Sequence, residues 1–500
     1  MLPRSFRYTS LTPALLAAIS TLSAQTINWD GNGDANASGD WLDDVNWAGD
    51  AAPSATSITA GLGNVSSGTR IITINTGETA TAKNLAFTQT SADGTNILSI
   101  ASGGTLNLGG GQIWDAPTAG TSRVELGGTI DFTGLTSGSV TVNTGLSFTA
   151  NGAVFRSSNA SGAPVFNFNG SVDVNVGSGG LAQIAYTGGN RAITTNFGAT
   201  SHLSISSGTL EIATPLYNNT PGVTISLQGT TAIAAGAGLK LTPDSASNGG
   251  GGSSGVSFSN SGALTIAGKI TTGGRGGGGA TTFTNSGTWH VSGLDAVIEK
   301  ATRAATGANP TFTNTTTGVF AGASADDRIV FNHDQIPGTD LAFTNSGVIA
   351  AGNGSGGDGL SSVGTLTLVN FAVVNTDTST LVFDVGGVST GQFDVLALES
   401  GTFDFGDATI SINLVNDFVP TTGFALDIFV TDAPASVSGT IAGLLVNGVA
   451  NDDFSFSYDA STGIGTLSFT GSAIPEPSSA AALLGAAGLG LAALRRRRSR

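Results

Sequence analysis

The densest group of ionisable side chains in the sequence could supply acid–base chemistry on a sugar polymer. Its members are Asp326, Asp327, Arg328, His333 and Asp334. Enzymes that cleave acidic polysaccharides use carboxylates to hold calcium and a nearby arginine or lysine as the base. Such a site draws these groups from several neighbouring segments, but the whole chain contains only four lysines. We therefore expect a solvated loop here.

Two shorter motifs match patterns of known chemistry only in part. Residues 387–391 read Gly-Val-Ser-Thr-Gly, the pattern of a nucleophile elbow, but no histidine follows His333 to complete a triad. We expect a hairpin turn there. Residues 30–34 place oxygen ligands at alternate positions, as calcium loops do. However, Ala35 and Trp41 stand where such a loop has glycine and glutamate, so a polar turn is the expectation.

The clearest functional signal is a three-part pattern in the last residues of the sequence. It begins with a proline–glutamate–proline triplet, continues with an uncharged apolar run and ends with an arginine cluster. These parts are Pro475, Glu476 and Pro477, then residues 480–494, then Arg495, Arg496, Arg497 and Arg498. As a helix the apolar run would span only about 25 Å, short for a permanent membrane span. The arginines would stay on the cytoplasmic side, so the preceding chain would lie outside.

This pattern resembles the PEP-CTERM sorting signal of Gram-negative bacteria. In that family an exosortase, a membrane protease, recognises the tail and removes it during export. The resemblance implies an exosortase-like protease as a partner and transient inner-membrane insertion through a C-terminal transmembrane helix. We expect residues 473–500 to be this sorting signal, and a plain tail anchor is the alternative.

Residues 1–24 have the pattern of a secretory signal peptide. Arg4 and Arg7 precede an apolar stretch at residues 11–22, and Ala24 supplies a small residue at the cleavage position. The sequence therefore predicts an N-terminal signal helix that is removed on export. Both ends of the chain thus indicate an exported protein.

The composition excludes several classes of function. Without the two arginines of the leader and the five arginines and one glutamate of the tail, 11 basic and 33 acidic residues remain, a net charge of −22. That charge repels nucleic acids and anionic membranes, so neither is an expected partner. The chain has no cysteine, which excludes disulfides, thiolate metal sites and cysteine nucleophiles. Nothing in the sequence indicates a cofactor.

Residues 58–360 consist of short strand-like alternations broken by glycine, asparagine and serine. A unit of phenylalanine followed two positions later by asparagine recurs at spacings of 25, 29 and 31 residues. Its copies begin at Phe258, Phe283, Phe312 and Phe343. Repeats of this length built from short strands are typical of stacked coils. We predict an all-β, right-handed parallel β-helix (solenoid), and a flat all-β sandwich is the alternative.

The same repeats predict the interior of the coil. The phenylalanines should be buried, and each asparagine amide should bond the asparagine of the neighbouring turn. The glycine-rich segment at residues 273–279 should be an exposed loop.

The two ends of the solenoid have sequences of their own. Residues 25–57 carry Trp29, Trp41 and Trp47 and resemble the start of autotransporter-like β-solenoid proteins. These tryptophans would cover the open end of the coil. Residues 361–472 have longer strands and resemble the last passenger section of the same proteins. They form either the final, wider turns of the solenoid or a small β-domain stacked on it.

These observations predict the destination and the fold of the protein more clearly than they predict a reaction. The resemblance implies an exported structural or adhesive protein of the cell surface or extracellular matrix, associated with exopolysaccharide in a biofilm. We expect it not to be an enzyme. The alternatives are a β-helix carbohydrate-active enzyme, such as a polysaccharide lyase or hydrolase, and a passive carbohydrate-binding protein.

Overall fold

The computed structural model describes residues 25–471 apart from short segments within that range. These segments are residues 110–111, 134, 136–138, 159–162, 189–190, 215–221, 244–254, 274–278, 302–308, 334–338, 353–362, 422 and 434–435. The predicted signal peptide at residues 1–24 and the sorting signal with its helix at residues 473–500 lie outside the described residues. In the part that the structure describes, the helical residues are the 3-10 turn η1 (Asp44–Asn46) and Ser436, and no helix there is long and apolar enough to cross a membrane.

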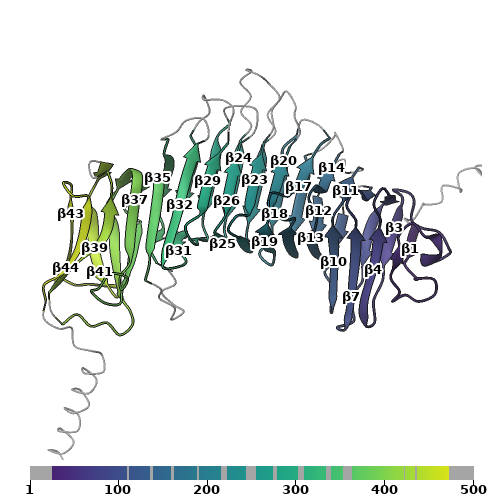
Figure 1. Ribbon diagram of the computed structural model, residues 1–500, viewed down its shortest axis with the longest axis horizontal. Coiled ribbons are helices and arrows are strands. Elements are labelled where there is room, and N and C mark those ends of the chain that lie inside the picture. The colour runs from purple at the N-terminus through teal and green to yellow at the C-terminus, as the bar shows by residue number, and fades with distance from the viewer. Residues whose placement is uncertain are drawn as a thin grey trace, which may run out of the picture.

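The described chain is a right-handed β-solenoid of about 12 turns, as predicted. Its strands stack side by side along the long axis of the molecule, from the N-terminal β1 to the C-terminal β43 and β44 (Figure 1). A complete turn contributes one strand to each of three faces, which we call faces A, B and C in the order in which the chain visits them. Pairing along each face is parallel as far as the C-terminal end of the stack, which excludes the flat sandwich.

Face A runs almost the whole length of the molecule. Its strands are β2 (Gly39–Asp40), β4 (Gly68–Ile74), β7 (Gly94–Ile100), β10 (Thr121–Leu126), β13 (Gly145–Phe148), β16 (Ser171–Asn175), β19 (His202–Ser207), β22 (Thr230–Ile233), β25 (Ala263–Ile266), β28 (Thr288–Val291), β31 (Val319–Gly322), β34 (Val348–Ala350), β36 (Thr380–Val385), β38 (Ala408–Leu414), β41 (Ile441–Val446) and the antiparallel β42 (Val449–Ala450).

Face B follows face A in each turn. Its strands are β5 (Thr79–Ala82), β8 (Thr105–Leu108), β11 (Thr129–Phe132), β14 (Ala153–Ser157), β17 (Leu181–Tyr186), β20 (Thr209–Ala213), β23 (Gly238–Thr242), β26 (Lys269–Thr272), β29 (Ala296–Lys300), β32 (Asp326–His333), the first halves of β35 (Thr365–Asn375) and β37 (Val395–Asp404), and β39 (Phe424–Thr431).

Face C completes the turn. Its strands are β1 (Gln25–Asn28), β3 (Ile58–Leu62), β6 (Asn84–Phe87), β9 (Gln112–Trp114), β12 (Ser139–Val142), β15 (Val165–Phe168), β18 (Ile193–Phe197), β21 (Val223–Leu227), β24 (Val256–Asn260), β27 (Thr281–Asn285), β30 (Thr311–Asn314), β33 (Leu341–Asn345), the second halves of β35 and β37, and β40 (Val437–Ser438).

The core is a column of apolar side chains that fills the coil along its length. Strand alternation turns every second residue inward, and β-branched and aromatic residues occupy those positions. The repeated phenylalanines stack between turns, with ring centroids 6.1 Å apart for Phe283 and Phe312 and 4.8 Å for Phe312 and Phe343. Phe283 and Phe343 are each 1% exposed, which confirms their predicted burial. Gly273 and Gly279 are partly exposed, and residues 274–278 lie outside the described part.

The predicted asparagine ladder is present at the ends of successive face C strands. Each Nδ2 donates a hydrogen bond of 2.8 Å to the Oδ1 of the asparagine in the next turn. The members, in order, are Asn260, Asn285, Asn314, Asn345 and Asn375. Because all five are buried, these bonds form in a medium of low polarity where an unmade hydrogen bond is costly. The last amide donates to the carbonyl oxygen of Asp404.

The three N-terminal tryptophans are buried together at the first turn. The rings of Trp29 and Trp47 meet edge to face with centroids 5.2 Å apart, and those of Trp41 and Trp47 lie 4.8 Å apart. The Trp47 indole N–H donates to the carbonyl oxygen of Trp41. These contacts place three bulky apolar groups together in the first turn, and their role as a cap over the end of the coil stays a prediction.

The C-terminal section continues the solenoid and then closes it. Strands β35 to β41 extend the same three faces by parallel pairing, which decides between the two alternatives in favour of further turns. The direction of pairing then reverses. Strand β44 (Ile464–Phe469) pairs antiparallel with β39 and with β43 (Phe454–Asp459), so a hairpin covers the edge of face B.

Candidate functional site

The ionisable cluster at residues 326–334 is not the predicted solvated loop. Its first eight residues form β32, where Asp327 is 1% exposed and His333 is also buried, and Asp334 lies outside the described residues. Arg328 points outward and pairs with Glu399 at 3.0 Å. The alternation that continues through Ile329 and Phe331 makes this segment a strand despite its charges.

Asp327 closes the corner between faces A and B. Its carboxylate accepts hydrogen bonds from the backbone N–H groups of Gly293 at 2.7 Å, Ala323 at 2.6 Å and Ser324 at 2.7 Å. The hydroxyl of Ser324 also donates to it. With its lone pairs committed to these donors, this carboxylate has a structural role.

Residues 387–391 form the predicted hairpin turn. Val385 and Phe393 are joined by an antiparallel bridge, and the N–H of Gly386 donates to the carbonyl oxygen of Gln392 at 2.7 Å. Ser389 is exposed in the turn. It therefore does not lie on a strand-to-helix elbow.

Two buried carboxylates lie at the base of this hairpin. Asp394 accepts hydrogen bonds from the N–H groups of Gly364 at 2.7 Å and Asp384 at 2.8 Å. Burial raises the pKa of Asp394 to about 7, although these backbone donors oppose the rise. Burial also raises the pKa of Asp384, whose carboxylate accepts a hydrogen bond from the Asn413 amide at 2.9 Å.

Residues 30–34 form the predicted polar turn. The carboxylate of Asp30 accepts the N–H of Asn32 at 3.1 Å, and that of Asp34 accepts the N–H of Asn36 at 3.0 Å. These carboxylates therefore cap their own backbone. Across the described residues, no group of three or more histidine, aspartate and glutamate side chains is placed to hold a metal ion.

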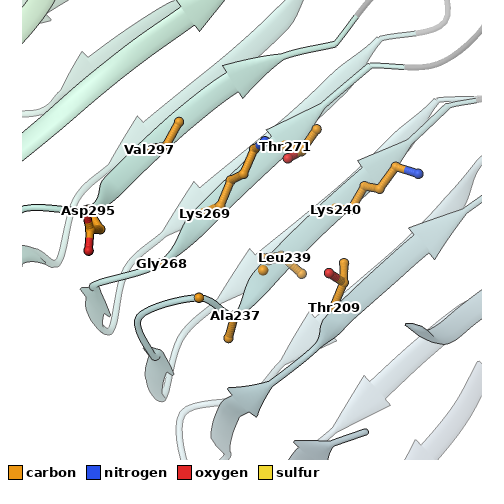
Figure 2. A pocket seen from close by; sticks show the side chains of 11 residues that line it. Thr209, Ala237, Leu239, Lys240, Gly268, Lys269, Thr271, Asp295 and Val297 are labelled. Atoms are coloured by element: carbon orange, nitrogen blue, oxygen red, sulfur yellow. The ribbon is translucent and has the colours of Figure 1, made fainter. Parts of the chain in front are cut away.

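A hollow of about 430 Å³ on face B lies beside charged side chains. It lies over β20, β23, β26 and β29, and Figure 2 shows Lys240 and Lys269 on neighbouring strands beside it. Gly238 pairs with Thr209 on one side and Lys269 on the other. Because glycine has no side chain, the outward row is interrupted at this point and the hollow forms.

Ion pairs hold the lysines in place beside the hollow. The carboxylate of Glu211 forms an ion pair with Lys240 Nζ at 2.8 Å. It also accepts hydrogen bonds from the Thr242 hydroxyl at 2.7 Å and the Gln183 amide at 2.7 Å. Burial alone would raise the pKa of Glu211, but these donors together lower it. Lys269 pairs in the same way with Glu299.

This arrangement can bind but is poorly suited to proton transfer. A carboxylate whose pKa is lowered stays ionised at neutral pH, so Glu211 accepts hydrogen bonds and does not act as an acid. The lysine ammonium groups, the Thr209 and Thr271 hydroxyls and Asp295 offer donors and acceptors to a hydroxylated molecule.

The sequence analysis did not single out these residues. One signal could have revealed them: Glu211, Lys240 and Lys269 are spaced 29 residues apart, within the range of the repeat spacings. In a solenoid that spacing places side chains on adjacent strands of the same face. The three residues do lie on consecutive strands of face B.

Comparison with protein families gives one match. Residues 473–498 match the PEP-CTERM protein-sorting motif, which includes the predicted triplet Pro475, Glu476 and Pro477 and the arginines at 495–498. No curated protein matches the chain. The motif implies export, processing by an exosortase and sorting to the cell surface or the extracellular space. The chain is thus an exported β-solenoid protein that carries a PEP-CTERM protein-sorting motif.

Proposed function

We propose that the processed chain is a structural or adhesive protein of the cell surface or extracellular matrix, associated with exopolysaccharide. The observation that supports this most directly is the parallel pairing that continues from turn to turn along the molecule. Every turn is hydrogen-bonded to the next through backbone ladders, and one apolar column runs through all of them. Such a body is a long rod with a large surface for its mass, which suits a scaffold.

The proposal includes the absence of an enzymatic reaction. Three buried acidic side chains serve the fold: Asp327 and Asp394 bind backbone N–H groups, and Glu211 is held in an ion pair. A lyase or hydrolase instead needs carboxylates or bases aimed at a bound sugar.

Removal of the chain from the producing cells tests the scaffold role. We expect mutant cells to retain less polysaccharide in their matrix and to adhere less well, and complementation should restore both. Unchanged retention and adhesion would contradict the proposal. Incubation of the purified protein with neutral and acidic polysaccharides tests the enzyme alternative, because new reducing or unsaturated ends would identify catalysis.

A further inference from the structure

Face C differs from the other two faces in its outward residues. From β9 to β33 its outward positions carry no charged side chain. Faces A and B carry outward ion pairs in the same stretch, such as Arg123 with Glu125 on face A and Lys240 with Glu211 on face B. In a chain with 33 acidic residues after processing, a charge-free face of this length is a distinct surface.

Uncharged polar side chains, all hydroxyls except the amide of Asn196, form two parallel rows on face C. The rows are in register from turn to turn because the strands pair in parallel without a shift. The first row is Thr194, Thr224, Ser257, Thr282 and Thr311, and the second is Asn196, Ser226, Ser259, Thr284, Thr313 and Thr344. Neighbours within a row are about 4.8 Å apart, and the rows are about 6.6 Å apart.

The central part of this array is both exposed and unpaired. Six of its hydroxyl residues are exposed to solvent, and within the described part of the chain none of them makes a side-chain hydrogen bond. They are Ser257, Thr282, Thr284, Thr311, Thr313 and Thr344. The hydroxyls are therefore available to a ligand, whereas on face B the outward polar groups are bonded to each other.

The backbone beneath the array is held in place by the core. Phe283 lies between Thr282 and Thr284 on β27, and Phe312 lies between Thr311 and Thr313 on β30, with both rings buried. The asparagine ladder fixes the ends of the same strands. A partner therefore meets hydroxyls in fixed positions and orders few groups on binding.

We propose that face C binds an uncharged polysaccharide chain lying along the long axis of the solenoid. Each hydroxyl both donates and accepts, as sugar hydroxyls do, so a linear polymer can bond successive turns in either direction. An acidic polymer would meet no counter-charge on this face and would be repelled by the net negative charge of the protein. This inference rests on the proposed association with exopolysaccharide and names the polymer class and the binding face.

Binding assays with protein recovered from outside the cell test the inference. The probes are cellulose and dextran, which are neutral, polygalacturonate, which is acidic, and matrix isolated from the producing cells. One variant replaces four face C threonines, Thr282, Thr284, Thr311 and Thr313, by valine, which keeps shape and strand propensity but removes the hydroxyl. A second variant replaces the same four by serine. The control replaces four outward face A threonines, Thr265, Thr288, Thr380 and Thr409, by valine.

We expect the unchanged protein to bind a neutral polymer and the face C valine variant to bind it at least about tenfold more weakly. The serine variant and the face A control should bind as the unchanged protein does. Equal binding by both valine variants would overturn the assignment of the binding site to face C. Binding to polygalacturonate alone would overturn the inference that the bound polymer is uncharged. In both cases the proposed function would stand. Failure to bind any probe, including isolated matrix, would overturn the proposed function itself.

Discussion

Glu211 shows how a single carboxylate contributes to the stability of face B. It accepts hydrogen bonds from Lys240, Thr242 and Gln183, and its pKa is lowered in the folded protein. A lowered pKa means that its stabilising effect is present above the unfolded pKa and is lost as the pH falls through the folded pKa.

We therefore expect Glu211→Gln to lower the free energy of unfolding by about 1–2 kcal/mol at pH 7, and by less at pH 3. Urea unfolding at the two pH values measures this difference. Glu125→Gln is the control, because Glu125 forms a more exposed pair with Arg123. This substitution should lower the free energy of unfolding by less than about 1 kcal/mol. If Glu211→Gln lowered the free energy of unfolding equally at both pH values, the ionised form of Glu211 would not be the source of the stabilisation.

The contribution of Asp394 to the free energy of unfolding should depend on pH in the opposite direction to that of Glu211. Burial raises its pKa to about 7, so between about pH 4 and pH 7 the folded state binds a proton that the unfolded state has lost. Its contribution to the free energy of unfolding therefore falls as the pH rises through this window. The decrease in stability from pH 5 to pH 8 should be smaller in Asp394→Asn than in the unchanged protein, as measured by urea unfolding.

The exposed Asp377 supplies the control for this measurement. Asp377→Asn removes the same charge without removing a buried group, so it should keep the full pH dependence. The same decrease in Asp394→Asn as in the unchanged protein would show that Asp394 does not titrate in this range.

The sorting residues give a prediction at the same scale. If an exosortase removes the tail, the protein outside the cell should lack Arg495 to Arg500, and its intact mass measures this. Replacement of Pro475, Glu476 and Pro477 by alanine should leave the protein in the inner membrane, detected by cell fractionation. A full-length chain outside the cell would contradict processing, and normal release of the alanine variant would contradict recognition of the triplet.

Single residues were predicted with uneven success. The polar turn at residues 30–34 and the hairpin at residues 387–391 followed from motifs that lacked required members. The cluster around Asp327 was mispredicted because its charges suggested solvation, while its alternation with Ile329 and Phe331 indicated a strand. The raised pKa of Asp394 depends on tertiary burial, which the local sequence does not contain.

At the scale of the elements, the asparagine ladder should be sensitive to the position at which it is interrupted. Asn314 takes part in two of the bonds between asparagines, whereas Asn260 is the first member of the ladder and takes part in one. Of the polar atoms in the described residues, the Oδ1 of Asn260 is among those that are buried without a hydrogen bond, so its removal relieves a cost.

We expect Asn314→Leu to lower the free energy of unfolding by about 2–4 kcal/mol and Asn260→Leu to lower it by less. Denaturant unfolding of both variants makes the comparison, and Asn260→Leu serves as the matched control. Equal costs would show that the bonds between the asparagines do not stabilise the stack.

The repeated elements were predictable because they occur in near-copies. Phe283 and its equivalents, with an asparagine two positions later, predicted both the interior and the ladder. The separation of charge between faces was not predicted. Glu211 and Lys240 are 29 positions apart, a spacing that fits one turn, but the sequence alone does not show which residue of β23 lies opposite Glu211, and the observed register does.

At the scale of the whole molecule, the two ends of the stack differ. Trp29, Trp41 and Trp47 pack together in the first turn, and the antiparallel β43–β44 hairpin follows the last. An open parallel edge would add further strands from other molecules, and an antiparallel hairpin limits that addition. The tryptophans were predictable as bulky residues in one short segment. The reversal of strand direction was not, since β43 and β44 have the same alternation as the strands before them.

The one-dimensional stacking of turns has a mechanical consequence. A load that draws the two ends apart acts along the ladders between turns, so it should peel the coil one turn at a time. Each turn thickens the rod by only about 4.8 Å but contains up to about 30 residues, which extend to about 100 Å when released. Single-molecule pulling should therefore give a series of small, evenly spaced extensions rather than one rupture. Under a sudden pulling force, each turn that unfolds would lengthen about twentyfold. A rod of this kind on the cell surface would therefore absorb mechanical energy by unfolding while it stays attached.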